Sequence, residues 1–222
     1  MTIFPDISKY QGRPNFDVMK SKTDYVILKA SQGDFVDPQF FRNRTECQRV
    51  GLSYGVYHFY DDRYSPGLQA QTLYNLLQNN PMPFEIWCDW ENTYSGNYKG
   101  LKNVVAFMER VELLTGKTVG IYTGYHWFVE NSHAIINDSQ YKYLASRPLW
   151  LAWYTPDFTN NGIERVKIPL PWHKMNIWQF GTPSLGAAYG VQSIEIDMNE
   201  KFDGIQSPPA SNVGGIKVRM FT

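Results

Sequence analysis

Eight short apolar runs recur along the chain, and segments with helical periodicity separate most of them. The runs cover residues 2–8, 25–31, 52–60, 84–91, 119–125, 149–154, 175–181 and 193–199. Several are apolar at successive positions, which is typical of strands buried on both faces. Strands that alternate with helices favour parallel pairing through strand–helix–strand units. The alternation therefore predicts an α/β fold with a parallel sheet.

Helical periodicity is found in about five segments, which are residues 15–21, 38–50, 67–78, 100–115 and 125–136. Asn15 and Asp37 are candidate N-caps, and Gly51 and Gly116 follow the ends of two of these helices. Eight strands in about 200 residues favour a closed, TIM-like (β/α) barrel whose late helices are missing. An open doubly wound sheet is the alternative, but no G-x-G-x-x-G or P-loop motif is present.

The barrel domain is expected to span residues 1–204. Residues 205–222 are rich in Gly, Pro, Ser and Asn at their start and are predicted to form a linker-like tail.

Composition excludes several classes of protein. The 222 residues contain 21 basic and 21 acidic side chains, so the chain lacks the basic excess that drives nucleic-acid binding. No apolar run is long enough to span a membrane, and no signal peptide is visible at the N-terminus. The two cysteines, Cys47 and Cys88, do not make a disulfide scaffold.

Carboxylates follow three of the predicted strands. Asp6 ends the first, Asp89 and Glu91 end the fourth, and Asp197 ends the eighth. In a closed barrel the first and last strands are neighbours, and functional residues gather at the carboxyl ends of the strands. We therefore expect these four groups to converge on one mouth.

Aromatic side chains end most of the other strands, and they are expected to bind substrate there: Tyr57, Tyr60, Tyr122, Trp153, Tyr154 and Trp178. Crowded carboxylates repel one another, so at least one should have a raised pKa. A protonated carboxyl beside an ionised one is the arrangement that glycoside hydrolysis requires. The pattern thus indicates a carboxylate-based barrel hydrolase.

Each residue also has a structural interpretation. Asp6 and Asp197 could cap turns, Asp89 and Glu91 could bind loop amides, and His58 could be a hydrogen-bonded core residue. Lys29 is expected to form a salt bridge with a carboxylate. No Cys/His spacing or H-E-x-x-H motif supports a metal site, so neither a metal nor another cofactor is expected.

The chain resembles the glycoside hydrolase family 25 muramidases, the Chalaropsis-type lysozymes of phage endolysins and bacterial autolysins. The similarity covers about residues 3–203, with matching segments in family order. These segments are Pro5–Gly12, Tyr25–Gly33, Asp37–Phe40, Gly51–Phe59, Trp87–Glu91, Thr115–Gly116, Gly120–Tyr122, Leu149–Tyr154, Ile177–Phe180 and Ile196–Asn199.

The resemblance implies an irregular barrel and cleavage of the β-1,4 bond between N-acetylmuramic acid and N-acetylglucosamine in peptidoglycan. It implies that Glu91 is the catalytic acid and Asp89 the assisting carboxylate, while Asp6 and Asp197 shape the field and bind sugar. Tyr57, Tyr122 and Trp153 match positions that line the sugar subsite on the non-reducing side of the cleaved bond. A monomer that acts on the extracellular cell wall, such as a phage endolysin released through a pore, is expected.

The chain departs from the family pattern at two places. Ser31-Gln32-Gly33 stands where Thr-Glu-Gly is common, and Trp90 is bulky for its position. Two other functions stay open. One is a non-catalytic peptidoglycan-binding or phage structural module. The other is a glycosidase for another N-acetylated polymer such as chitin, although the longer strand-4 motif of the best-known chitinases is absent.

Overall fold

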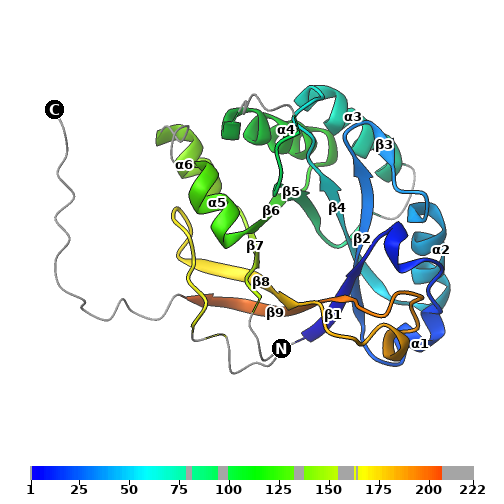
Figure 1. The fold of residues 1–222 in the computed structure, drawn as a ribbon. Helices are drawn as coiled ribbons and strands as arrows, with labels where there is room; N and C mark the ends of the chain where they lie inside the picture. The colour runs from blue at the N-terminus through cyan, green and yellow to red at the C-terminus, as the bar shows by residue number, and fades with distance from the viewer. Residues whose placement is uncertain are drawn as a thin grey trace, which may run out of the picture.

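Eight strands close into a barrel in the computed structural model, which describes residues 2–78, 82–94, 100–132, 138–154, 163 and 165–206 (Figure 1). In order around the barrel they are β1 (Thr2–Ile7), β2 (Tyr25–Gln32), β4 (Ser53–Phe59), β5 (Ile86–Asp89), β6 (Val119–Gly124), β7 (Leu149–Ala152), β8 (Lys174–Gly181) and β9 (Asp197–Gln206). Pairing of β1 with β2 closes the circle. The predicted eight-stranded barrel is confirmed.

The last strand differs from its prediction in position and direction. β9 begins at Asp197, instead of ending near it, and it runs antiparallel to both β1 and β8. Residues 193–196 form a turn in which Ser193 Oγ donates to the Glu195 carbonyl. The strand lacks a clear apolar run because Asn199 and Lys201 occupy its inner face and Glu200 stands between the outward Met198 and Phe202. It extends to Gln206, past the expected domain end at residue 204, whereas residues 207–222 lie outside the described part of the chain.

Helices surround the barrel beside strands β2 to β7 (Figure 1). Among the described residues the α-helices are α1 (Phe16–Lys20), α2 (Phe40–Val50), α3 (Pro66–Leu77), α4 (Gly100–Thr115), α5 (Tyr125–Ser132) and α6 (Asp138–Ala145). The sequence predicted about five and missed α6. Short 3-10 helices at Lys9–Gln11 and Ala187–Tyr189 and a two-residue strand, β3 (Phe35–Val36), complete the fold.

The caps follow the sequence in most cases. Asn15 Oδ1 accepts from two backbone amides of α1, and Gly51 ends α2 in the left-handed conformation. Asp37 is not the N-cap of α2, because that helix begins at Phe40 after Gln39. Its carboxylate instead accepts from the backbone amides of Lys9, at 3.0 Å, and Gln39, at 2.9 Å. Asp37 thereby fixes the loop after β1 against the segment that leads into α2.

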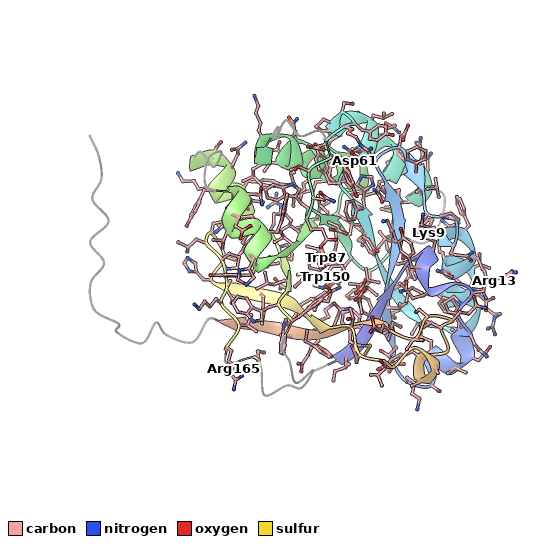
Figure 2. All side chains as sticks on the ribbon, viewed as in Figure 1. Lys9, Arg13, Asp61, Trp87, Trp150 and Arg165 are labelled. Carbon is pink, nitrogen blue, oxygen red and sulfur yellow. The ribbon has the colours of Figure 1, made fainter. Side chains whose placement is uncertain are left out.

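Aromatic rings fill the barrel interior. A buried cluster draws side chains from six of the barrel strands, and the half-buried Tyr57 of β4 packs against it, so it must lie inside the barrel: Phe4, Tyr25, Ile27, Trp87, Tyr122, Trp150 and Ile177. Figure 2 shows Trp87 and Trp150 side by side, and their ring centroids are 5.8 Å apart. The larger apolar cluster, which includes Phe107 and Met108 of α4, lies between the strands and the helices. Both cysteines are buried and free.

A polar group closes the end of the barrel opposite the carboxylate mouth. Glu85, just before β5, accepts from the Tyr25 hydroxyl at 2.8 Å and pairs with Lys201 of β9. The Lys201 ammonium also lies over the Tyr25 ring. This end is therefore held by contacts across the barrel. In the described part of the chain, no helix combines the length and apolarity needed to cross a membrane.

Gly120 provides a test of the interior packing. It pairs with Trp87 across β5 and β6, and a Cβ atom there would overlap the Trp87 ring. The ring cannot retreat, because Trp150 packs against it. We expect Gly120→Ala to lower the free energy of unfolding by about 1–3 kcal/mol in denaturant melts. The control is Gly67→Ala on α3, where a Cβ meets no atom within 4 Å. If both variants melt like wild type, the barrel is not tightly filled.

Candidate active site

The structure brings the four predicted carboxylates to one mouth of the barrel. Asp6 ends β1 and pairs directly with Asp197, the first residue of β9. Because β9 is antiparallel, its start lies at the same barrel end as the carboxyl ends of the parallel strands. Asp89 ends β5, and Glu91 follows two residues later. Asp6 lies close enough to raise the pKa of each of the other three through its charge.

Asp6 is held by two side-chain amides. Its Oδ2 accepts from Gln179 Nε2 and from Asn199 Nδ2, both at 2.9 Å. Burial raises the pKa of Asp6, and the two amide donors oppose that rise because they stabilise the ionised form. Asp6 is therefore an oriented carboxylate and not a cap of the loop that follows it.

Asp89 is a buried carboxylate with a free acceptor. The side chain is 4% exposed, and its Oδ1 has no hydrogen-bond partner among the described residues. Burial, reinforced by the charge of Glu91, raises the pKa of Asp89 well above its usual range, although Lys29 acts in the opposite direction. A buried acceptor without a donor costs free energy, so this oxygen is suited to a donor that a ligand brings.

Glu91 and Asp197 also have raised pKa values, each chiefly through burial. For Glu91 a hydrogen bond with Tyr122 opposes the rise and the charge of Asp6 adds to it. For Asp197, burial and then the charges of Asp6 and Glu91 raise the pKa to about 8. Asp197 thus retains a proton near neutral pH. The raised pKa of Glu91 favours its protonated form, which is the form that a general acid requires.

An aromatic cavity of about 620 Å³ adjoins Glu91. Its walls include Tyr122 of β6, Trp127 of α5, and Trp153 and Tyr154, which directly follow β7. His126 also lines it, and its ring lies 5.5 Å from that of Trp153. Aromatic rings beside Glu91 can stack on the apolar faces of a sugar, while polar groups of the site bind the sugar hydroxyls.

A second cavity, of about 570 Å³, lies on the other side of the carboxylates. Asp197 and Glu195 line it together with Tyr10 and Gln11 after β1. The carboxylates therefore lie between two recesses, an arrangement that suits an extended substrate passing over the barrel mouth.

The predicted substrate-binding aromatics divide into two groups. Tyr57, Tyr122, Trp153 and Tyr154 lie at the mouth: the last three line the aromatic cavity, and the hydroxyl of Tyr57 is influenced by the charges of Asp6 and Asp89. Tyr60 and Trp178 do not lie there. Tyr60 is 1% exposed and packs against Phe107 of α4, and Trp178 is fully buried and donates to the Trp153 carbonyl. Both point outward from the barrel, so they support the site from behind.

Two further sequence interpretations are settled by contacts. His58 is a core residue: Ser31 and Gln69 hydrogen-bond its ring nitrogens, the Phe107 ring stacks on it, and burial lowers its pKa to about 4. Lys29 makes no salt bridge within the described ranges. Its ammonium donates to Gln32 Oε1 at 3.0 Å and lies over the Phe59 ring, while its charge still acts on Asp89.

Gln179 and Asn199 are the functional residues that the sequence analysis missed. Both are buried on the inner face of the barrel and both bind Asp6. Gln179 Oε1 also accepts from the hydroxyls of Tyr122, at 2.8 Å, and Tyr154, at 2.9 Å. The available signal for Gln179 was an amide side chain within the otherwise apolar run of residues 177–180, whereas the mixed sequence of β9 gives no such signal for Asn199. The bulky Trp90, in contrast, packs outward against Trp127 and Phe128 of α5.

The raised pKa of Asp197 predicts how stability changes with pH. The folded protein binds a proton at Asp197 up to about pH 8, whereas the unfolded chain releases it near pH 4, at about the usual pKa of aspartate. The free energy of unfolding therefore falls as pH rises through this window. We expect Asp197→Asn to raise the melting temperature at pH 8 by at least about 3 °C and to leave it nearly unchanged at pH 4.

Asp24→Asn is the matched control, because the Asp24 side chain is 86% exposed. That variant should change the melting temperature equally little at both pH values. A melting temperature for Asp197→Asn at pH 8 that equals or falls below that of wild type would show that Asp197 is ionised at little cost.

Comparison with known proteins agrees with this geometry. The model of the glycosyl hydrolases family 25 matches residues 5–185. Lysozyme M1 of Streptomyces globisporus is 26% identical over 215 residues, which cover 90% of this chain and 67% of that protein. A solved muramidase from Trichobolus zukalii is 26% identical, with a TM-score of 0.71, over 91% of this chain and 94% of that chain.

The uncharacterized protein YegX of Escherichia coli is 27% identical over 157 residues, which cover 67% of this chain. The match covers 55% of that relative, so the chain spans about half of its length. The family model covers most of the barrel, including the carboxylates Asp6, Asp89 and Glu91. The chain belongs to the glycosyl hydrolases family 25.

Proposed function

We propose that this chain is a muramidase that hydrolyses the β-1,4 bond between N-acetylmuramic acid and N-acetylglucosamine in peptidoglycan. The observation that carries the proposal is a half-buried Glu91 with a raised pKa, beside Asp89 and at the edge of an aromatic cavity. The similarity to Lysozyme M1 and to the Trichobolus zukalii muramidase supports the choice of substrate. The bacterial cell wall is then the site of action.

Glu91 acts as the general acid. It follows the end of β5 and lines the aromatic cavity, so it meets a substrate that lies in that cavity. Burial favours its protonated form, and a proton on Glu91 can pass to the oxygen of the leaving sugar. The low dielectric of the mouth strengthens the interaction of the remaining carboxylates with the positive charge that develops on the sugar ring.

Asp89 assists through the acetamido group of the substrate. Its unpartnered Oδ1 can accept from an acetamido N–H, which orients the acetamido oxygen toward the anomeric carbon. The donor also relieves the cost of the buried acceptor. The reaction then retains the anomeric configuration without an ester between protein and sugar. Asp6 and Asp197 hold the sugar and set the field of the mouth, and Tyr57, Tyr122, Trp153 and Tyr154 contact the rings.

Removing either carboxyl tests these roles. We expect Glu91→Gln to lower the rate of peptidoglycan clearing at least about a hundredfold, because the amide cannot donate a catalytic proton. Asp89→Asn should also lose activity, because the amide cannot support a cationic intermediate. Turbidity clearing and the release of reducing ends measure both effects.

Glu109→Gln is the matched control, since Glu109 is exposed on the outer face of α4 and should clear as fast as wild type. Wild-type clearing by Glu91→Gln would exclude Glu91 as the acid. Binding of peptidoglycan without any cleavage by the wild-type chain would instead favour a non-catalytic module.

Product analysis tests which bond is cleaved. We expect mass spectrometry of reduced digestion products to find muramic acid at the new reducing end. Glucosamine at that position would indicate a glucosaminidase, and cleavage of chitin at a rate similar to that of peptidoglycan would favour the alternative polymer. Proton NMR during the first turnovers should show the β-anomer as the initial product. An initial α-anomer would contradict the retaining route.

A further inference from the structure

A third and smaller recess opens at the barrel mouth, apart from the two cavities described above. Its volume is about 260 Å³, less than half that of either larger cavity, and it shares no lining residue with them. Lys9 after β1, Lys29 and Gln32 of β2 and Arg63 after β4 contribute to its walls. Its size suits a substituent of the substrate better than a further sugar of the glycan.

The recess lies near Asp89, to one side of a path that joins the two larger cavities. Those cavities border β6 and β7 on one side and β9 and β1 on the other, whereas the recess borders β2 and β4. Gln32 pairs with Phe59, and Phe59 pairs with Asp89. Two strand spacings separate Gln32 from Asp89, which is about 10 Å. About three residues of extended chain span that distance.

Two lysine ammonium groups at the recess have no charged partner in the part of the chain that the structure describes. Lys29 is half-buried, and its ammonium donates to the neutral Gln32 Oε1 at 3.0 Å and lies 4.7 Å from the centre of the Phe59 ring. Lys9 is exposed, with its ammonium 5.1 Å from the centre of the Tyr10 ring. Both ammonium groups can therefore pair with an anionic ligand.

The two acidic side chains of the recess already have partners within the protein. Asp61 forms a two-point ion pair with Arg63, at 2.9 Å to Nε and 2.6 Å to Nη2. The Asp37 carboxylate accepts from the backbone amides of Lys9 and Gln39. Three basic and two acidic side chains line the recess in all, so its net charge is positive.

An apolar wall and an open sheet edge favour a peptide over a small anion. β3 contributes Phe35 and Val36 to the recess, and both side chains are exposed. β3 is also the last strand of the sheet, beyond β2, so among the described residues its outer edge has no strand partner. An extended peptide can pair with such an edge and cover the apolar side chains. A lone phosphate or carboxylate would use neither feature.

We propose that this recess binds the acidic peptide that muramic acid carries on its lactyl group, with Lys29 and Lys9 paired to a peptide carboxylate. The inference rests on the proposed function, because it takes peptidoglycan as the substrate. Gln32 sets the preference, since its neutral side chain leaves the charge of Lys29 for the substrate. It is also the position at which the chain departs from the common Thr-Glu-Gly pattern.

The experiment compares two substrates that differ only in the charge of the peptide. Soluble, uncrosslinked glycan strands with their peptides are acetylated at free amines, and one half is then converted to neutral methylamides with carbodiimide and methylamine. Because the same bond is cleaved in both, the ratio of their kcat/KM values cancels effects on the chemical step. We expect the full chain to prefer the acidic strands by about tenfold.

Two substitutions test the assignment of this preference to the recess. Gln32→Glu should bring the ratio close to one, because the new carboxylate pairs with Lys29 and repels the peptide. Lys9→Gln should lower the ratio by about threefold. The matched controls are Gln71→Glu, exposed on α3, and Lys22→Gln, exposed before β2 at the opposite end of the barrel. Both controls should keep the wild-type ratio.

Strands that an amidase has stripped of peptide separate the peptide from the lactyl carboxylate, which these strands keep. We expect them to be cleaved as slowly as the neutral strands. Cleavage at the rate of the acidic strands would overturn the peptide as the ligand. Equal kcat/KM values for acidic and neutral strands, or a preference that survives Gln32→Glu, would overturn the site.

Binding distinguishes a failure of this proposal from a failure of the proposed function. Titration calorimetry with Glu91→Gln measures the affinity for both kinds of strand without turnover, and it should show the same preference. Equal affinities together with equal cleavage would remove the peptide site and leave the muramidase. Tighter binding of the acidic strands, without cleavage of either kind by the wild-type chain, would remove the proposed function and leave the peptide site.

Discussion

The site depends on the packing of Trp150 inside the barrel. Its ring contacts those of Trp87 and Tyr122, with centroids 5.8 and 4.6 Å away, and so joins the filled interior to the layer beneath the mouth. Its indole N–H also fixes Asn199, which in turn binds Asp6. A smaller residue here would leave a void and remove the donor at the same time. Water that entered the void would hydrate the carboxylates and lower their pKa values, because burial is the first cause of each shift.

The carboxyl groups that the proposed chemistry requires therefore destabilise the folded state at the mouth of the barrel. Four carboxyls with raised pKa values, of which Asp6 and Asp89 are buried and the other two half-buried, weaken the fold as pH rises, since the folded state binds protons that the unfolded chain releases. Contacts at the other end of the barrel, where Glu85 binds Tyr25 and Lys201, and the aromatic interior between the two ends offset this cost. Lys29 reduces the mutual repulsion without a direct ion pair, so it lowers the pKa of Asp89 but leaves its Oδ1 unoccupied.

Sequence reasoning located the strands that are apolar on both faces and, through them, Asp6, Asp89 and Glu91 at or just after their ends. The sequence analysis failed for residues whose role depends on whether they face the inside or the outside of the barrel. β9 places Asn199 and Lys201 inside the barrel, so it lacks the apolar run that marked the other strands. A strand end also does not reveal which way a side chain points: Tyr57 faces inward, whereas Tyr60 and Trp178 pack against the surrounding shell. Gln179 was missed because an amide has no charge to attract notice, and its importance lies in partners that are distant in sequence.

The side-chain amides of Gln179 and Asn199 explain why four similar carboxyls need not behave alike. Asp6 receives two amide donors, which favour its ionised form, whereas Asp89 Oδ1 receives none from the described residues. Glu91 instead faces a phenol whose proton has a competing acceptor in Gln179. Burial raises every pKa in the group, so burial alone cannot assign separate roles to its members. The hydrogen-bond donors distinguish them, and because the Trp150 indole N–H, which can only donate, orients the Asn199 amide, part of this distinction is built into the barrel before substrate binds.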